Sequence, residues 1–249
     1  MSSFELTGLV PARILKRYKR FLADVELECG KVATAHCTNT GAMSTCWEPG
    51  DSAQLLPSQN PARKLPYTWI ACCRQGTWVG VETGLPNKIV SQWLREGSIP
   101  SLGGLSGIRT EVPYGAERSR IDVWGVDPGG RQTFIEVKNA TMRCGDAACF
   151  PDAKTERGVK HLRELQLVAR EGHRAVILFF INRNDVGSFA TARHIDPIYA
   201  DELDRAVAAG VEVLPLLTGI SAEKSCDGTW SLRWGLEKEL VFDSEAGQT

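Results

Sequence analysis

The chain contains 249 residues with a formal net charge of −1, and 43% of its residues are hydrophobic and 24% charged, as in soluble globular proteins. This length is enough to bury the core of one large or two smaller domains, whereas the longest apolar run, Ala175 to Ile181, is far shorter than the roughly 20 residues of a transmembrane helix. The N-terminus also lacks the basic and apolar regions of a signal peptide, so we expect a cytoplasmic protein with no membrane partner.

The eight cysteines do not form a recognisable metal or redox motif. Cys72 and Cys73 are adjacent, and Cys144 and Cys149 lie five residues apart. No pair has the CxxC spacing of zinc and redox sites, which favours buried or incidental reduced thiols.

Basic residues are concentrated near the N-terminus although the whole chain is almost neutral. Residues 1–80 carry a net charge of +3, whereas residues 81–249 carry −4. A local basic patch can bind the phosphates of DNA on a neutral protein, and a solvated basic face is the alternative. The DNA contacts predicted in this segment are Arg13, Lys16, Arg17, Lys19 and Arg20.

The first third of the chain has the pattern of a small β barrel. Apolar and polar residues alternate from Phe21 to Glu28, and the turn Cys29-Gly30 follows. The predicted strands cover residues 21–28, 32–36, 52–56, 67–73 and 77–82. Five short strands favour an all-β OB-like barrel, which is the nucleic-acid-binding form of small barrel.

Aromatic and basic residues alternate in the predicted barrel, and this mixture has two explanations. Bases could stack on the rings beside phosphate contacts, or the rings could pack in the barrel core. The rings are those of Tyr18, Phe21, Tyr67 and Trp69, and Arg63 and Lys64 are the added DNA-binding candidates.

The other two-thirds of the chain has an α/β pattern. We expect a helix over 87–95, a strand over 108–112, an irregular loop over 141–154, a helix over 155–171, a strand over 174–181, a helix over 197–209 and a strand over 211–217. Strand, helix and strand at the end of this series form a βαβ unit. The chain after Thr218 is polar and predicts no element.

The stretch from Ser119 to Ala140 predicts a hairpin, because two β-rich flanks enclose Asp127-Pro128-Gly129-Gly130. Side chains alternate along a strand, so Glu136 and Lys138 share one face. A loop of two or four residues would leave Asp122 on the opposite face from Glu136. A loop of three residues with a glycine bulge would instead pair Asp122 with Glu136 directly.

The spacing of Asp122 and Glu136-Val137-Lys138 resembles the PD-(D/E)xK nuclease motif, in which the acids lie together as they would with the three-residue loop. Oxygen ligands hold Mg²⁺ or Mn²⁺, and the cation activates a bound water beside the scissile phosphate. The predicted catalytic residues are Asp122, Glu136 and Lys138, and the predicted metal ligands are Asp122, Glu136 and Val137. The alternative is a surface hairpin with solvated charges.

The helix over 155–171 carries a second group of candidates. Arg157, Lys160, His161 and Glu164 share one face at i, i+3, i+4 and i+7. Arg157, Lys160 and His161 are therefore predicted DNA contacts near the acidic hairpin. A solvated helix face is the alternative.

The chain resembles the sugar fermentation stimulation protein (SfsA) family over almost its whole length. The matching stretches are 17–25, Asn39-Thr40-Gly41-Ala42-Met43, 114–122, Ile135-Glu136-Val137-Lys138, Phe150-Pro151-Asp152-Ala153, 155–158, 160–165 and 192–196. The family has proline where Thr38 stands, and the part of the chain after Leu217 diverges.

The resemblance implies an N-terminal OB domain, residues 1–83, and a C-terminal restriction-endonuclease-like domain of mixed sheet and flanking helices, residues 84–249. It also implies DNA binding without sequence specificity and a regulatory link to maltose metabolism. Many relatives of the nuclease fold supply a further acid from the first helix, and Glu111 is the nearest substitute here. Two functions therefore remain open: a metal-dependent nuclease, or a non-enzymatic DNA-binding regulator on the same scaffold.

Overall fold

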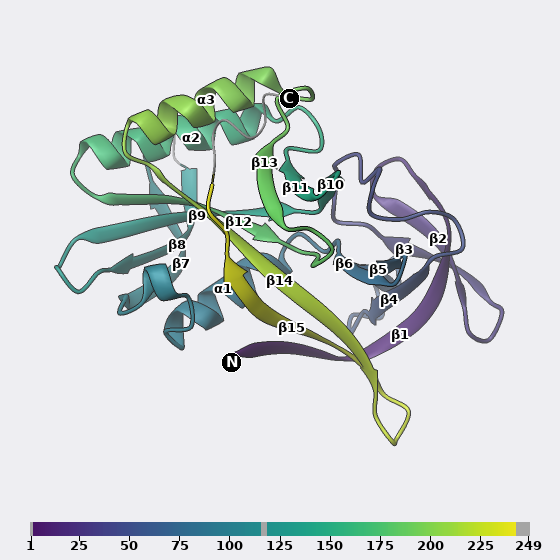
Figure 1. The fold of residues 1–249 in the computed structure, drawn as a ribbon. Coiled ribbons are helices and arrows are strands. Elements are labelled where there is room, and N and C mark those ends of the chain that lie inside the picture. Colours follow the sequence, from purple (N-terminus) through teal and green to yellow (C-terminus); the bar gives the residue numbers. More distant parts are fainter. Residues whose placement is uncertain (1, 116–118, 243–249) are drawn as a thin grey trace.

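A five-stranded barrel forms the N-terminal part of the molecule in the computed structural model, which describes residues 2–115 and 119–242 (Figure 1). Its strands are β1 (Ser3–Tyr18), β2 (Leu22–Leu27), β3 (Val32–His36), β4 (Ser52–Pro57) and β5 (Tyr67–Arg74), and β6 (Thr77–Gly80) pairs with β5. The ring closes because β1 pairs with both β2 and β4, while β3 pairs in parallel with β5. Ile14, Val25, Leu55 and Trp69 fill its core. The predicted OB-like barrel is confirmed.

The C-terminal part is built on a mixed sheet in the order β15-β14-β12-β9-β8-β7. These strands are β7 (Ser106–Tyr114), β8 (Ser119–Val126), β9 (Gln132–Ala140), β12 (Arg174–Ile181), β14 (Glu212–Lys224) and β15 (Trp230–Glu239). β12 lies parallel to both β9 and β14. The predicted βαβ unit is therefore confirmed.

Helices cover both faces of this sheet. The helix α1 (Leu85–Arg95) packs on one face, and the helices α2 (Glu156–Arg170) and α3 (Pro197–Ala208) pack side by side on the other; a 3₁₀ turn, η1, spans Pro100–Leu102 (Figure 1). Val176, Leu178 and Phe180 of β12 belong to the α1 core, while Ile177 and Phe179 belong to the other. Because helices cover both faces of the sheet, every residue of β12 from Ala175 to Ile181 is apolar.

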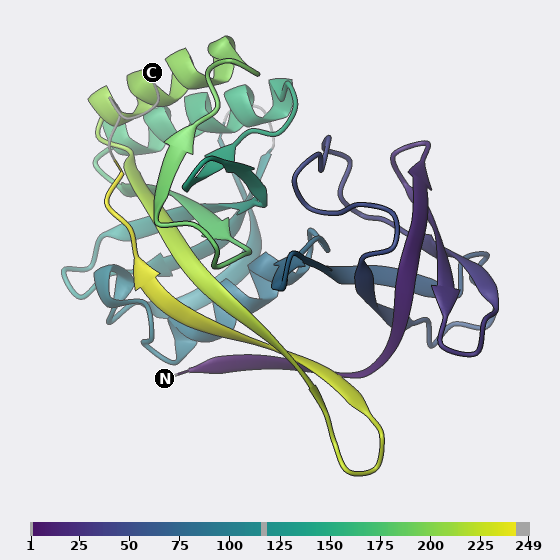
Figure 2. The same cartoon turned by 45° about the vertical axis from the view of Figure 1, so that its right-hand side comes forward.

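The first strand joins the two parts. From Ser3 to Leu9 it pairs with β15, and from Val10 to Tyr18 it belongs to the barrel (Figure 2). The strand order is therefore continuous from the barrel to the C-terminal sheet, to which the start of the chain contributes. The division at residues 83 and 84 stays a prediction about domains.

Two expectations about irregular segments are wrong. Residues 141–154 contain β10 (Met142–Cys144) and β11 (Ala147–Phe150), which join β13 (Ser188–Thr191) in a small sheet. The segment after Thr218 completes β14 and forms β15. Strands this short, or stabilised by pairing with the other end of the chain, leave little local signal.

None of the helices within residues 2–115 and 119–242 combines the length and apolar character required to cross a membrane.

The loop between β3 and β4 connects the barrel to the second domain. From the barrel side, the Arg17 guanidinium donates to the carbonyl oxygens of Asn39 at 2.8 Å and Gly41 at 2.9 Å. From the other side, the Asp152 carboxylate accepts from Met43 N at 3.2 Å and packs directly on Gly41. Arg183, which is 2% exposed, also donates to the carbonyl oxygens of Thr45 and Thr141. The loop is thus fixed by charged groups from both domains.

A second contact between the domains involves a glycine. Gly80 N donates to the carbonyl of Asn182, and the Asn182 side chain accepts from Trp234 Nε1 at 2.9 Å. A Cβ on Gly80 would lie 2.3 Å from Asn182 Oδ1. Only glycine allows the barrel edge to approach this buried amide.

Gly80→Ala is expected to lower the free energy of unfolding by about 1–3 kcal/mol, because the new methyl group must displace the Asn182 amide. Gly235→Ala is the matched control, since it is also a strand glycine and its added Cβ would meet no atom within 4 Å. Urea denaturation of the two variants measures the difference. Equal stabilities would show that the Asn182 contact is not tightly packed.

Arg17→Met is expected to lower the free energy of unfolding by about 2 kcal/mol, because it leaves several carbonyls of residues 39–42 without their charged donor. Arg13→Met serves as the control. Arg13 is exposed and makes a single hydrogen bond of 3.3 Å to Gly50 O, so its loss should change stability by no more than about 0.5 kcal/mol. An Arg17 variant as stable as the control would contradict the assigned role.

Candidate active site

The β8–β9 hairpin has the register that brings its two acids opposite each other. Val123 pairs with Ile135, which places Asp122 across from Glu136. Asp127 N donates to Arg131 O at 2.9 Å, so the loop consists of Pro128, Gly129 and Gly130. Gly130 has a φ of +83°, the left-handed conformation of a glycine bulge. Of the loop lengths left open by the sequence, the structure has the three-residue loop that pairs the two acids.

Asp122 is held by two hydrogen bonds at the point where β8 and β9 separate. Its Oδ2 accepts from Val137 N at 2.7 Å, and its Oδ1 accepts from Asn87 Nδ2 at 2.7 Å. Burial, followed by the charge of Glu136, raises the pKa of Asp122 to about 6. Asn87 is the residue that α1 contributes, so the helix supplies an amide where a further carboxylate was sought.

Glu136 is the buried centre of the cluster, with 2% of its surface exposed. Its Oε1 accepts from Lys138 Nζ at 2.6 Å and also contacts His161 Nδ1. Burial would raise the pKa of Glu136, but the neighbouring Lys138 and His161 more than offset it and hold that pKa below its usual value. The second oxygen, Oε2, has no hydrogen-bond partner within the part of the chain that the structure describes.

His161 belongs to this cluster and not to a DNA-facing surface. It is 5% exposed, and its Nε2 accepts from Arg157 Nε at 3.3 Å. With Nε2 accepting, Nδ1 carries the proton and donates to Glu136. The predicted DNA contact at His161 is therefore corrected: α2 turns this side chain toward the sheet, while Arg157 remains exposed and Lys160 is half-buried.

Tyr114 and Glu164 are further residues of the cluster that were not assigned to it from the sequence. Glu164 is 2% exposed, and a Cβ on Gly115 would lie 2.6 Å from its Oε1. Burial and the charges of Glu136, Glu164 and Asp122 raise the pKa of Tyr114 well above its ordinary value. The sequence shows that Glu164 lies one helical turn after Lys160, but it does not show that the Glu164 side chain points toward the sheet.

Glu111 does not take the place of a third acid. The β7–β8 pairing puts it opposite Asp122, since Thr110 pairs with Val123 and Val112 with Ile121. Its side chain is exposed and its φ is +56°, which interrupts the regular strand. Among the described residues, no hydrogen bond or ion pair links its carboxylate to Asp122 or Glu136.

The cluster offers few but suitable groups for a hard cation. Within residues 2–115 and 119–242, no group of three or more His, Cys, Asp and Glu side chains is arranged to hold a metal ion. Two adjacent carboxylates with an orphaned buried oxygen, Glu136 Oε2, nevertheless fit a cation that keeps several waters. Val137 supplies its N–H to Asp122, and a ligand role for its carbonyl stays a prediction.

The basic residues of the barrel are distributed over different places. Arg17 is committed to loop carbonyls, and Lys16 pairs with Asp24 at 3.2 Å. Arg13 lines a separate cavity with Glu26 and Glu28. Arg63 lies 3.2 Å from His36 Nδ1, and Lys19 and Lys64 are exposed. Together these residues do not form one uniform patch, and their DNA contacts stay predictions.

The barrel aromatics also differ in role. Trp69 is fully buried in the barrel core, so packing explains it. Phe21 is 50% exposed, and Tyr18 donates its hydroxyl to Asp24. Only the less buried rings remain available for stacking on bases.

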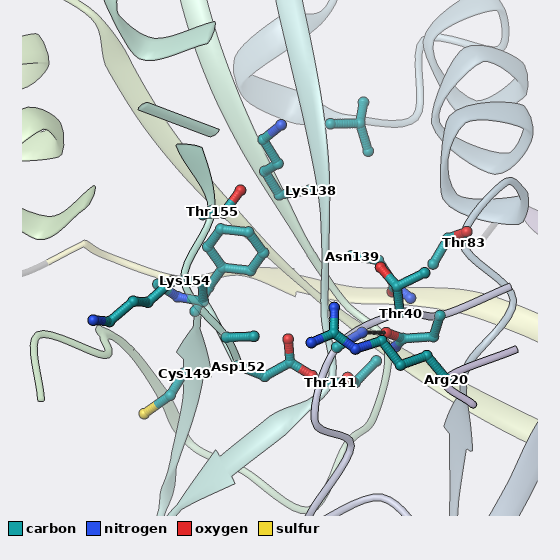
Figure 3. A pocket seen from close by; sticks show the side chains of 16 residues that line it. Arg20, Thr40, Thr83, Lys138, Asn139, Thr141, Cys149, Asp152, Lys154 and Thr155 are labelled. Carbon is teal, nitrogen blue, oxygen red and sulfur yellow. Dashed lines mark hydrogen bonds between the residues drawn. The ribbon is translucent and has the colours of Figure 1, made fainter. Parts of the chain in front are cut away.

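Arg20 alone among the basic residues predicted in the barrel enters a cleft next to the acid cluster. This interdomain cleft has a volume of about 320 Å³ and lies between the β1–β2 turn, the loop of residues 39–41 and the β9 residues Val137 to Asn139. Figure 3 shows Arg20 facing Asp152 across the cleft, with Lys138 at one end. The cleft is also lined by Thr40, Thr83, Thr141, Cys149, Phe150, Lys154 and Thr155.

Comparison with known proteins places this architecture in one family. Residues 15–81 match the family model "SfsA N-terminal OB domain", and residues 84–224 match "Sugar fermentation stimulation protein RE domain". Ala116, Glu117 and Arg118, within the stretch that resembles the family at 114–122, lie outside the described residues.

Similar proteins cover nearly the whole chain. A sugar fermentation stimulation protein homolog of Cyanothece is 46% identical over 90% of this chain and 94% of its own, and that of Geobacter metallireducens is 47% identical over 88% and 94%. The solved structure of Pyrococcus furiosus SfsA in complex with Ca²⁺ has a TM-score of 0.81 at 29% identity, covering 95% of this chain and 96% of that one. With an OB domain followed by an RE domain of mixed sheet and helices, the chain belongs to the sugar fermentation stimulation protein family.

Proposed function

We propose that this protein is a DNA nuclease that hydrolyses phosphodiester bonds with the help of Mg²⁺ or Mn²⁺. The observation that carries the proposal is the meeting of Asp122, Glu136 and Lys138 on two adjacent strands, at the mouth of an interdomain cleft. A chance occurrence of the sequence motif would not require a shared face, a buried carboxylate and a neighbouring cleft.

Asp122 and Glu136, with the carbonyl of Val137, would hold the cation. When bound, such a cation neutralises charge on the scissile phosphate and lowers the pKa of a bound water. Asn87 orients the Asp122 carboxylate, and His161 orients that of Glu136. Lys138, 14% exposed at its side chain, lies between the buried acid and the cleft, where it can orient the attacking water. The Ca²⁺ complex of the Pyrococcus relative supports a site for hard divalent cations.

DNA is the proposed partner, bound through phosphates and without sequence specificity. The OB domain and Arg20 support nucleic-acid binding, and Arg157 lies on the exposed side of α2. We also propose a cytoplasmic location, because all eight cysteines are free thiols, as expected in a reducing compartment.

A non-enzymatic DNA-binding regulator is the second candidate. One observation favours it: α1 contributes the amide of Asn87 to Asp122 where many nuclease-like proteins have an acid. In that case the cluster would stabilise the fold and the cleft would bind DNA without cutting it. The next two experiments separate the candidates.

Lys138→Ala is expected to reduce Mn²⁺-dependent cleavage of plasmid and single-stranded DNA at least about hundredfold, because a preorganised group beside the reacting phosphate is lost. DNA affinity measured without metal should change little, since one lysine is a small part of a surface that binds many phosphates. Lys238→Ala, at an exposed position on β15, is the matched control and should cleave normally.

The same assay tests the origin of any activity. Asp122→Asn should also abolish cleavage and weaken Mn²⁺ binding, because it removes a charged ligand. Cleavage that persists in a Glu136→Gln, Lys138→Ala double variant would assign the activity to another site. No metal-dependent cleavage by the wild-type protein would favour the regulator.

Asn87→Asp is expected to tighten Mn²⁺ binding about tenfold, because it adds a carboxylate 2.7 Å from Asp122 and raises the charge of the ligand set. Isothermal titration with Mn²⁺ measures this affinity without any need for cleavage. Asn60→Asp, the same chemical change on an exposed loop, is the control and should leave the affinity unchanged. Equal affinities for all three proteins would place the cation away from Asp122.

A further inference from the structure

The interdomain cleft has walls that come from both domains. One wall carries Arg20 and Thr40 from the barrel, and the other carries Lys138, Asn139 and Thr155 from the second domain (Figure 3). We propose that this cleft seats one unpaired nucleotide of a DNA strand, so that the substrate is single-stranded DNA or a single-stranded segment. The proposal rests on the proposed nuclease function and names its substrate class.

The size of the cleft favours a single strand. Its volume of about 320 Å³ lies at the lower end of the roughly 300–1,000 Å³ typical of ligand pockets. A single nucleotide is a ligand of this size, whereas a duplex presents two paired strands and needs a larger space. Bases freed from pairing can enter, as they do in enzymes that act on extruded nucleotides.

Contacts between the two domains hold the walls of the cleft together. Asp152 accepts from Met43 N and leaves no room for a Cβ on Gly41, where the gap would be 2.2 Å. Arg183, held within the second domain by the Thr141 carbonyl at 2.9 Å, donates across the boundary to the Thr45 carbonyl at 3.2 Å. These contacts tie the barrel loop to the second domain, so the two walls of the cleft cannot separate without breaking them.

Arg20 provides the charge that a phosphate requires. The structure shows no hydrogen bond or ion pair from its guanidinium to the described residues, in contrast to Arg17 and Lys138. Its φ is +63° and that of Lys19 is +50°, and Arg17 Nη2 holds the turn by donating to Arg20 O at 3.0 Å. A turn in this uncommon conformation, between the first two strands of an OB barrel, directs a free cation into the cleft.

The hydroxyl, amide and aromatic groups of the remaining lining suit a base and a sugar, beside one carboxylate, Asp152, which accepts from Met43 N. Thr40, Thr83 and Asn139 present hydroxyl and amide groups, and Phe150 is a half-buried aromatic ring. Polar groups and one ring bind bases of any sequence by hydrogen bonding and stacking. Lys138 lines the cleft and also contacts Glu136 at 2.6 Å, so a nucleotide seated here brings an adjacent phosphate to the acid cluster.

Binding measurements without metal test the proposal independently of cleavage. A fluorescently labelled oligothymidylate and a blunt duplex of equal length are titrated with the full chain in EDTA, over a range of salt concentrations. The wild type should bind the single strand more tightly. Arg20→Gln should flatten the slope of log K against log salt by about 0.7 on the single strand, which is about a fivefold loss of affinity at 0.1 M salt.

Two further variants make the result specific to the cleft. Thr83→Glu, at an exposed position on the rim, should weaken single-strand binding by charge repulsion. Arg233→Gln is the matched control, because Arg233 is an exposed arginine on β15 that does not line this cleft. It should leave the single-strand slope unchanged.

The outcomes distinguish this proposal from the nuclease proposal. Duplex binding as tight as single-strand binding, or an equal loss on both DNAs in Arg20→Gln, overturns the single-strand seat. Cleavage of blunt duplex that requires Lys138, without single-strand preference, overturns the seat and retains the nuclease. Single-strand binding that depends on Arg20, without cleavage under any metal, supports the seat and removes the nuclease function.

Discussion

The position of every group in the candidate site depends on how β8 and β9 are paired. A shift of one residue would send Asp122 to the opposite face of the sheet from Glu136, because side chains alternate along a strand. The loop Pro128-Gly129-Gly130 prevents that shift, since Gly130 adopts a left-handed conformation and Asp127 N closes the loop on Arg131 O. The conformation of this loop thus sets the relative positions of two acids that lie about six residues from it on either side.

Burial of Glu136 requires compensation, and the cluster provides it from several elements. An ionised carboxylate that is 2% exposed would be costly alone, so Lys138 from the same strand and His161 from α2 both contact it. Arg157 fixes the other nitrogen of His161. Within residues 2–115 and 119–242, Asp122 has no ion pair or hydrogen bond with a cationic side chain, and burial and Glu136 raise its pKa to about 6. The pair therefore has an excess of negative charge, which is the condition under which a divalent cation is bound well.

Contacts between the two domains hold the barrel beside the acid cluster of the second domain. Arg17 and Asp152 hold the loop of residues 39–43 from opposite sides, and Arg183 fastens it at Thr45. The N-terminal strand adds a second connection, because its first residues pair with β15 before it enters the barrel. These contacts join the walls of the cleft beside the acids, and Asp152 packs so closely on Gly41 that a side chain there would collide with it.

The sequence by itself determined those features that depend on near neighbours along the chain. The helices at 155–171 and 197–209, the strand at 174–181 and the hairpin at 119–140 were all predicted, because propensity and turn chemistry act over a few residues. The length of the hairpin loop was left open. The resemblance to the family added the order of the two domains.

Only the tertiary structure decided what the side chains contact. Asn87 meets Asp122 across 35 positions of sequence and His161 meets Glu136 across 25, so no local pattern could reveal either contact. Arg17 and Arg20 are three residues apart and equally basic, yet one is consumed by loop carbonyls and the other faces the cleft. A charged residue in a sequence shows which kinds of interaction are available to its side chain. The packing of distant segments determines which partner that side chain contacts.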